Sequence, residues 1–576
     1  MSGQSHLLAT RRFLPLFVTQ FLGAFNDNVF KNALVVLLTF QAARWTSLPA
    51  GILANLAAGV FILPFFLFSA TAGQLADKYD KARLARLVKV LEMAIMAVAG
   101  VGFWLTSLTW LFVALFMLGL HSTLFGPIKY ALLPQHLHPD ELLGGNALVE
   151  AGTFVSILLG TLAGGLLAGA GAPLAIAAVG LLVAAAGYLA SRAIPTAPAP
   201  APDLVVHPNP LAETWRCIGY ARENNAVFQS ILGVSWFWLF GALFLAQFPA
   251  YAKNVLGGGE TAVTLLLATF TVGVGLGSLA CERLSGRRIE LGLVPFGSIG
   301  LTLFALDLAL HSPALLPGGA PLALAELLGQ PGSVRVLADL ALIGLFGGFF
   351  IVPLYALVQQ RSRPEARARV IAANNIMNAL FMVAGALAAT GLLAAGLSIP
   401  DLFAVAAVMN AVVALYIYLM VPEFLIRFVV WLALRLTGRI EAEGMERLPP
   451  HDGAVLVLES PEKIRPRDLV AVMAACERPI RFLVDAELAR RPGYGLMLRR
   501  AKAIFADHAR LGRAALADGQ LVAVAHNPIA PEALLGDATP VPVFRVVLQP
   551  AASLWARSRM RVEAVAGTLP GTAGPN

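Results

Sequence analysis

Four polar residues near the N-terminus interrupt a long hydrophobic stretch and have the side chains to bind a charged ligand: Asn26, Asp27, Asn28 and Lys31. A charge near the centre of a membrane-spanning helix costs roughly 2.5–3.5 kcal/mol on insertion scales, so such residues usually serve a function. Asp27 and Lys31 are four residues apart and share one helix face. We therefore predict a site for a ligand with both charges and hydrogen-bonding groups. The alternative is an internal Asp27–Lys31 ion pair that serves only stability, although buried pairs rarely stabilise more than apolar replacements do.

Later hydrophobic stretches supply further candidates for the same site, and these are Lys129, Asn146, Glu150, Asn374 and Asn378. Glu150 and Asn146 are four residues apart and face the same way on a helix. We expect Glu150 and Asn146 to face the cavity, Lys129 to hold an anion, and the two later amides to hydrogen-bond a polar group. Three alternatives stay open: Glu150 pairs with a basic residue on another helix, Lys129 extends to the membrane interface, or the amides join neighbouring helices.

A short basic loop resembles the signature loop between the second and third helices of the major facilitator superfamily, and its candidate residues are Gly73, Asp77, Lys78, Lys81 and Arg83. The resemblance implies a conformational latch. In one conformation Asp77 can cap the N-terminus of a neighbouring helix or pair with a basic residue. Loss of that contact would allow two parts of the molecule to move. The alternative interpretation is a solvated loop whose charges only fix the orientation of the chain in a membrane.

The composition requires that much of the chain lies in lipid. The sequence has 576 residues, of which 58% are hydrophobic and only 13% are charged, whereas soluble proteins have about 25% charged residues. The three cysteines are scattered and predict neither a disulfide framework nor a metal site, and no cofactor is expected. The net charge of +8 does not indicate a nucleic-acid partner, because the basic residues lie where membrane topology requires them.

Twelve hydrophobic stretches are long enough to cross a bilayer core of about 30 Å as helices. The first six lie near 13–40, 49–76, 85–105, 107–130, 145–168 and 172–193. The second six lie near 226–252, 262–283, 290–311, 337–360, 370–395 and 401–421. A Pro- and Ala-rich segment separates the two sets. We therefore expect a six-helix bundle over 1–193, a cytoplasmic linker over 194–225 and a second six-helix bundle over 226–421.

Charge distribution and internal repeats give the orientation and the fold class. Basic residues concentrate in alternate loops, which predicts that both termini are cytoplasmic. Short matches recur in the same order in both sets of stretches, pairing 73–77 with 277–281, 127–135 with 353–360 and 145–150 with 373–378. The sequence thus predicts an all-α membrane protein of 12 transmembrane helices in two parallel six-helix repeats, with a binding site between them. This arrangement resembles the major facilitator superfamily.

The character of the sequence changes after Val421. Segment 422–439 carries two arginines among Trp and aliphatic residues, which is typical of an amphipathic helix at the membrane interface. From residue 440 to 576, short strand-like runs at 454–458 and 541–547 alternate with helical stretches. This pattern predicts a small cytoplasmic α/β domain.

Three long blocks of the first 425 residues are similar to bacterial lysophospholipid transporters. They are Gly23–Ala33, which contains the first polar cluster, Phe125–Gln135, and Gly144–Gly152. The resemblance implies a protein of the bacterial inner membrane that flips lysophospholipids, chiefly lysophosphatidylethanolamine, to the cytoplasmic leaflet for reacylation. The ammonium of such a head group would suit Asp27 or Glu150, and its phosphate would suit Lys31 or Lys129.

The C-terminal segment resembles the glycerolipid acyltransferase domains that are fused to some members of this family. The family's catalytic pair is His-x4-Asp, in which histidine is the base. Counting back from Asp468 places Lys463 at the histidine position, and lysine is charged near neutral pH. We therefore expect a degenerate, inactive domain, and we consider a separate acyltransferase as a partner.

Two other functions remain compatible with the same residues. One is a proton-coupled drug or metabolite exporter of the same fold, in which Asp27 and Glu150 carry protons. The other is a bifunctional protein whose C-terminal segment still acylates lysolipids.

Overall fold

The computed structural model is helical up to residue 420 and contains a β-sheet after residue 440. It divides into two compact units, Met1–Ala414 and Leu415–Asn576, and each is considered by itself. The predicted interfacial helix at 422–439 and the predicted position of Lys463 lie outside the described residues. Those residues are 4–40, 45, 50–285, 292–313 and 322–420, with 440–444, 447–449, 452–460, 468–469, 472, 476, 480–484, 503–505, 509–517, 520–525, 541–549 and 558–564.

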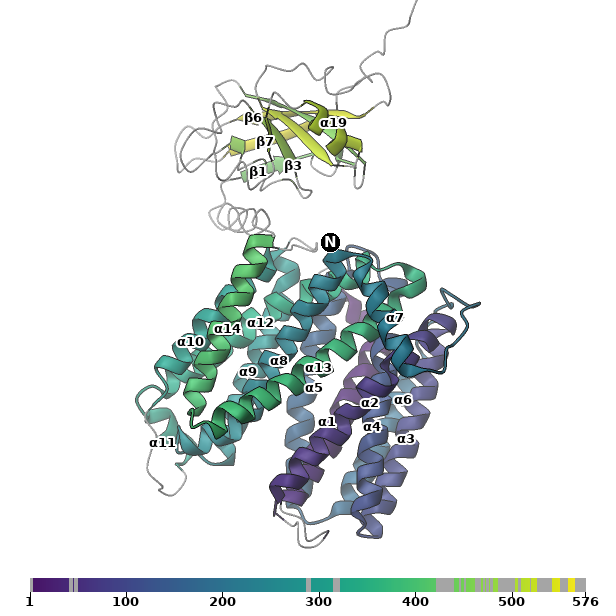
Figure 1. Ribbon diagram of the computed structural model, residues 1–576, viewed down its shortest axis with the longest axis vertical. Coiled ribbons are helices and arrows are strands. Elements are labelled where there is room, and N and C mark those ends of the chain that lie inside the picture. The colour runs from purple at the N-terminus through teal and green to yellow at the C-terminus, as the bar shows by residue number, and fades with distance from the viewer. Residues whose placement is uncertain are drawn as a thin grey trace, which may run out of the picture. The chain divides into compact units, whose positions relative to one another are not determined.

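The first half of the helical unit is a bundle of six long helices that follows a short 3-10 helix, η1 (Gln4–Ala9) (Figure 1). Each predicted stretch of this half overlaps one of these helices. Phe30, Phe103, Leu115 and Ala177 are among the buried side chains that form its apolar core. The six helices are α1 (Leu14–Phe40), α2 (Ala50–Lys78), α3 (Lys81–Trp104), α4 (Leu108–His136), α5 (Leu142–Gly169) and α6 (Pro173–Arg192).

The second half repeats six long helices, with one short helix between them. The predicted linker contains a further helix, α7 (Pro210–Arg222), which begins at the N-cap Asn209 with Pro at its first turn. The helices of this half are α8 (Asn225–Asn254), α9 (Glu260–Leu284), α10 (Leu293–Leu310), α11 (Leu324–Gly329), α12 (Ser333–Arg361), α13 (Arg367–Ala394) and α14 (Ile399–Met420).

Eleven helices in the described part of the chain are long and apolar enough to span a membrane. α1 is not one of them, although it has 27 residues, because the amides and charges between Asn26 and Asn32 lower its mean hydropathy. α1 instead packs tightly inside the bundle. A Cβ atom at Gly160 of α5 would lie 2.5 Å from the carbonyl oxygen of Phe25. Small residues thus let α5 approach the backbone of α1 next to the polar cluster.

The unit after Leu415 contains a seven-stranded sheet with the order β1-β7-β6-β2-β5-β3-β4. Neighbouring strands are parallel except β6 and β7, which are antiparallel. The two strands predicted from sequence are present as β2 and β6. The strands are β1 (Ile440–Glu443), β2 (Ala454–Glu459), β3 (Ile480–Val484), β4 (Ile504–Phe505), β5 (Leu521–Ala525), β6 (Val543–Gln549) and β7 (Ser558–Ala564), and α19 (Ala509–Ala517) precedes β5.

Candidate functional site

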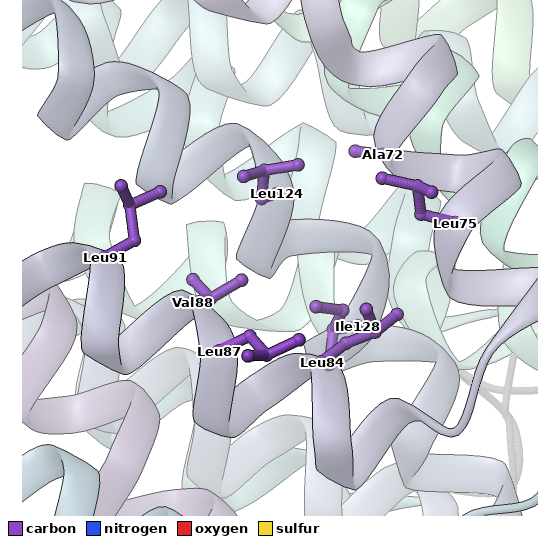
Figure 2. Close-up of a pocket in the computed structure, with 8 residues that line it drawn as sticks. All are labelled: Ala72, Leu75, Leu84, Leu87, Val88, Leu91, Leu124 and Ile128. Atoms are coloured by element: carbon purple, nitrogen blue, oxygen red, sulfur yellow. The ribbon is translucent and has the colours of Figure 1, made fainter.

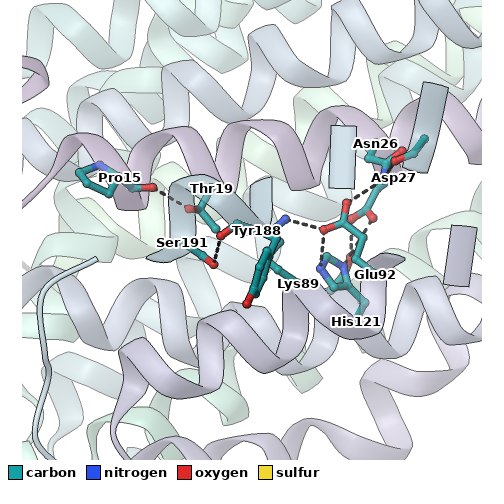
Figure 3. A network of polar contacts seen from close by, with 11 residues as sticks. Pro15, Thr19, Asn26, Asp27, Lys89, Glu92, His121, Tyr188 and Ser191 are labelled. Carbon is teal, nitrogen blue, oxygen red and sulfur yellow. Dashed lines mark hydrogen bonds and ion pairs between the residues drawn. The ribbon is translucent and has the colours of Figure 1, made fainter. Parts of the chain in front are cut away.

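A buried network of charged side chains joins three helices of the first half (Figure 3). Lys89 and Glu92 of α3 form an ion pair at 2.6 Å, and Asn26 of α1 donates a hydrogen bond of 2.7 Å to the other carboxylate oxygen of Glu92. His121 of α4 lies between two carboxylates: its Nε2 is 3.2 Å from Glu92 and its Nδ1 is 3.7 Å from Asp27. Charged groups from α1, α3 and α4 therefore meet around one imidazole.

Asp27 and Lys31 do not pair with each other in the described part of the chain. Asp27 accepts a short hydrogen bond from the hydroxyl of Ser122 and faces His121, and its side chain is 13% exposed. Lys31 lies over the ring of Phe61 on α2, with its Nζ 5.3 Å from the ring centroid. One turn of α1 thus carries a carboxylate and an ammonium group that do not form an ion pair with each other.

A second cluster lies between the halves and contains Glu150. The hydroxyl of Tyr130 on α4 donates a hydrogen bond of 2.5 Å to Glu150 on α5. The ring of Tyr130 stacks on that of Tyr355 from α12, with centroids 4.5 Å apart. Trp238 of α8 in turn donates a hydrogen bond of 3.0 Å to the Tyr355 hydroxyl. Lys129 lies beside this cluster, with its Nζ 4.4 Å from the Tyr130 ring centroid.

The amides predicted for the site have separate partners. Asn146 and Gln359 exchange two hydrogen bonds of 2.9 and 2.8 Å between α5 and α12. Asn378 accepts a hydrogen bond of 2.8 Å from Ser235. Asn28 donates a hydrogen bond of 2.8 Å to the carbonyl of Ala24 in its own helix. Asn374 is buried, and both polar atoms of its side chain are without a hydrogen-bond partner among the described residues.

These contacts sort the predicted site residues into three groups. Asn26 and Asp27 belong to the network of the first half, whereas Lys129 and Glu150 belong to the Tyr130 cluster. Asn146 joins the halves through Gln359, and not through the asparagines that the sequence repeat places opposite it.

The predicted latch residue Asp77 joins the end of α2 to the start of α13. Its buried carboxylate accepts hydrogen bonds from the backbone N–H groups of Ala368 (3.0 Å) and Arg369 (3.2 Å), and from Nε of Arg369 (3.0 Å). Gly73 allows this close approach, because a Cβ there would lie 2.8 Å from the Cβ of Ala372. Asp77 thus caps a helix of the opposite half and also pairs with a basic residue there.

The other loop residues have supporting contacts within or beside the first half. Asp80 occupies the N-cap of α3 and accepts a hydrogen bond of 2.8 Å from the backbone N–H of Arg83. The Nζ of Lys78 is 5.8 Å from the centroid of the Tyr79 ring. Lys81 is buried, and its ammonium is without a hydrogen-bond partner among the described residues.

The N-terminal segment makes a second connection near the same end of the bundle. The backbone N–H of Gln4 donates to Glu282 of α9 at 2.9 Å, and its side chain donates to the carbonyl of Leu279 at 2.8 Å. Arg12 forms a bidentate pair with Glu141, at 2.6 and 2.5 Å. Partial burial acts to raise the pKa of Glu141, but the hydrogen bonds and charge of Arg12 outweigh it and hold that pKa below its ordinary value.

These clusters also contain residues that the sequence patterns do not single out as site residues: Lys89, Glu92, His121, Tyr130, Tyr355, Gln359 and Arg369. One signal was available for His121, since an ionisable residue within a hydrophobic stretch is a functional candidate by default. No comparable signal pairs Gln359 with Asn146, because these residues are 213 positions apart.

A cavity of about 180 Å³ opens between α2, α3 and α4 (Figure 2). Its lining is apolar: Ala72, Leu75, Leu84, Leu87, Val88, Leu91, Leu124 and Ile128. It holds none of the polar candidates and offers only surface for hydrocarbon. Among the described residues, no group of three or more His, Cys, Asp or Glu side chains has the arrangement of a metal site.

Comparison with known proteins places these features in a family. Two similar relatives are named Lysophospholipid transporter LplT. That of Serratia proteamaculans (strain 568) is 28% identical over 376 residues, which is 64% of this chain and 85% of the relative. That of Salmonella schwarzengrund (strain CVM19633) is 29% identical over 384 residues, which is 64% of this chain and 84% of the relative.

Solved structures of other transporters share the fold. The human organic anion transporter MFSD10 (TETRAN) matches with a TM-score of 0.53 and 15% identity, over 70% of this chain and 99% of that one. The major facilitator transporter FucP in its outward conformation matches with a TM-score of 0.52 and 13% identity, over 71% of this chain and 99% of that one. The family model for the Major Facilitator Superfamily matches residues 16–334. Together with the eleven candidate spans, this match makes the protein a multi-pass membrane transporter, and the chain belongs to the Major Facilitator Superfamily.

Proposed function

We propose that this protein moves lysophospholipids, chiefly lysophosphatidylethanolamine, across a bacterial inner membrane to its cytoplasmic leaflet, where they are reacylated. The relatives named as lysophospholipid transporters support the substrate class. The observation that carries the proposal is the separation of Asp27 from Lys31, because a zwitterionic head group needs an anion and a cation that do not neutralise each other. If Asp27 and Lys31 already formed an ion pair, neither charge would be available to the head group.

The head group and the acyl chain would contact different parts of the helical unit. The ammonium would pair with Asp27 or Glu150, and the phosphate with Lys31 or Lys129, in each case as charge-assisted contacts. Asn26, Asn28, Asn146, Asn374 and Asn378 remain proposed as hydrogen-bonding residues of the site. The acyl chain would lie along Phe-rich segments of α2 and α8.

The proposed transport is alternating access, with Asp77 in the latch. We infer twelve membrane spans, of which α1 is the twelfth, and cytoplasmic positions for both termini and for the end of α2. The contact of Asp77 with α13 would then hold the cytoplasmic side closed. Gly73, Lys78, Lys81 and Arg83 would support that contact, and its release would open the path to the inner leaflet.

We further propose that the region after residue 440 has no acyltransferase activity and that a separate acyltransferase uses the transported lipid. The sequence places Lys463 where the catalytic histidine is expected. The segment around Asp468 lies beside a parallel sheet, since Leu469 packs in the core of that sheet. The segments 422–439 and 440–576 would then be an interfacial helix and a cytoplasmic domain.

A transport assay tests the proposed substrate and the role of Asp27. Vesicles that contain the full-length protein receive fluorescent lysophosphatidylethanolamine, and its protection from a membrane-impermeant quencher reports movement. We expect Asp27→Asn to lower the rate tenfold or more, because hydrogen bonds to charged groups contribute about 1.5–3 kcal/mol.

The matched control for this assay is Asp203→Asn, which changes an exposed aspartate of the predicted linker and should transport normally. An equal rate for Asp27→Asn would remove Asp27 from the site. Absence of lysolipid movement in the unmodified protein, together with efflux of an amphiphilic drug, would favour an exporter instead.

A further inference from the structure

The polar network of the first half contains groups that the proposed transport does not use, and His121 is central among them. We propose that His121 carries a proton that competes with the cationic head group for Asp27, so that acid weakens substrate binding. This inference rests on the proposed function, because it assigns the ammonium of the substrate to Asp27.

The position of His121 suits a proton carrier. Its ring lies between Glu92 at 3.2 Å and Asp27 at 3.7 Å, and its side chain is only 2% exposed. Within the described ranges, neither ring nitrogen has a hydrogen-bond partner, so a small rotation of the ring would make or break each contact. Histidine is the side chain whose charge changes most readily between pH 5 and 8, and chains of carboxylates and imidazoles carry protons in transporters.

The contacts among the charged side chains explain why His121 would hold a proton. Lys89 is already paired with Glu92 at 2.6 Å, so no lysine or arginine of the described residues is in contact with the carboxylate of Asp27. A proton on His121 supplies a cation, and burial makes an uncompensated carboxylate costly. An ammonium group bound at Asp27 supplies the same charge, so the proton is then no longer needed. The proton and the head group therefore exclude each other.

The remaining charged groups on the helices packed around His121 contact other side chains. Lys31 lies over Phe61 and Lys129 lies over Tyr130, and both are proposed to hold the phosphate. Glu150 of α5 is hydrogen-bonded to Tyr130. α6 supplies the carbonyl of Gly180, which accepts a hydrogen bond of 3.1 Å from Asn26. None of these groups, in the described part of the chain, stands between His121 and Asp27.

The exposure of the neighbouring side chains indicates the path of the proton. Asp27 is 13% exposed, whereas the side chains of Lys89 and Glu92 are fully buried. When an ammonium group reaches Asp27, the proton on Nδ1 of His121 passes to water on the Asp27 side, and the imidazole becomes neutral. When the ammonium group leaves, water returns one proton to Nδ1.

Binding measured as a function of pH tests this competition. Purified full-length protein in nanodiscs is titrated with fluorescent lysophosphatidylethanolamine between pH 5.5 and 8. We expect Kd to rise as the pH falls over this range, by at most tenfold for each unit of pH, which is the limit for one competing proton. Binding should also release up to one proton per protein into a weakly buffered solution near pH 6. The His121→Gln variant should bind at pH 8, with a Kd that does not change over this range.

Two controls separate this effect from others. His136→Gln changes another histidine of α4, whose ring contacts the carbonyl of Thr196, and should keep the pH profile of the unmodified protein. Lysophosphatidylglycerol has no ammonium group, so acid should not weaken its binding. The Arg12–Glu141 pair does not contribute, because the pKa of Glu141 is held below its ordinary value, which is about 4.3.

The outcomes are distinguishable. Lysophosphatidylethanolamine binding without proton release, or an unchanged pH profile in His121→Gln, would overturn the competition and leave the proposed function intact. Failure of the unmodified protein to bind lysophosphatidylethanolamine at any pH would overturn the proposed function and the competition with it.

Discussion

At the scale of single residues, the site depends on which polar groups are paired and which are not. Among the described residues, Glu92 has three partners, Lys89, Asn26 and His121, which hold it in place. In the same part of the chain, Asp27 has only the hydroxyl of Ser122 and the more distant imidazole of His121. A ligand would therefore bind to Asp27 at little cost, whereas it would have to break an ion pair to reach Glu92.

The reciprocal pair of Asn146 and Gln359 gives a prediction at this scale. Each side chain is buried and hydrogen-bonded to the other, so Asn146→Leu or Gln359→Leu alone leaves a buried amide without its partner. We expect each single substitution to lower the free energy of unfolding by about 1–3 kcal/mol. The double substitution should cost less than the sum, with a coupling of about 0.5–3 kcal/mol.

Thermal unfolding of the four proteins in detergent measures this cycle. The change Thr390→Val, on an exposed part of α13, serves as a control and should leave the unfolding temperature nearly unchanged. Additive effects of the two leucine substitutions would show that the amides do not stabilise the contact between the halves.

At the scale of elements, contacts at helix ends connect the halves in addition to the side-chain contacts between α5 and α12. The end of α2 meets the start of α13 through Asp77, and the N-terminal segment meets α9 through Gln4. Contacts at helix ends are local and few, so they can be exchanged without repacking a whole interface. This property suits the proposed alternating access, in which the halves separate.

We expect Asp77→Asn to loosen the contact between the end of α2 and the start of α13. The substitution removes a charge that accepts three hydrogen bonds from α13, and hydrogen bonds to charged groups contribute about 1.5–3 kcal/mol. A cysteine introduced by Asn375→Cys, which replaces a side chain packed against Gly126 of α4, should then react about tenfold or more faster with a membrane-impermeant thiol reagent. The three native cysteines, Cys217, Cys281 and Cys476, are buried, and burial raises the pKa of Cys217 to about 12, so these thiols add little background.

The matched control is Asp80→Asn. Asp80 belongs to the same loop but caps α3 within its own half, so its substitution should leave the labelling rate unchanged. Equal labelling in Asp77→Asn and in the unmodified protein would show that Asp77 does not hold the halves together.

At the scale of the whole molecule, two units of different character share one chain. The helical unit belongs to a family of transporters, and the sheet of the second unit is mostly parallel. A parallel sheet is a common support for enzyme sites, but a fold does not by itself establish an activity.

We expect the full-length protein to produce no phospholipid when incubated with lysophosphatidylethanolamine and an acyl donor. The physical reason is that a lysine at the position of the catalytic base is protonated at neutral pH and cannot accept a proton from the acceptor hydroxyl. Chromatography of the lipid products measures the reaction, and an active acyltransferase under the same conditions is the positive control. A labelled diacyl product would show that the second unit retains activity.

Much of the helical fold could be predicted from the sequence, because hydrophobic stretches of fixed length are a strong signal in membrane proteins. The role of Asp77 as a cap was also predicted in kind, since a short acidic side chain beside a helix break suits that role. Its partner was not predicted, because the start of α13 is about 290 residues away. His121 was missed for a different reason: its importance arises from Asp27 and Glu92, which lie on two other helices and approach it only in the folded bundle.

The contact between Asp77 and α13 has an evolutionary consequence. Two of its three donors are backbone N–H groups, those of Ala368 and Arg369, and every amino acid except proline supplies such a donor. Substitutions of Ala368 are therefore buffered, and substitutions of Arg369 remove only the side-chain donor, whereas substitutions of Asp77 remove the acceptor of all three hydrogen bonds. In a library of random variants, those that lose the contact between Asp77 and α13 should carry substitutions of Asp77 or proline at one of its partners. Suppressors should arise elsewhere in the chain.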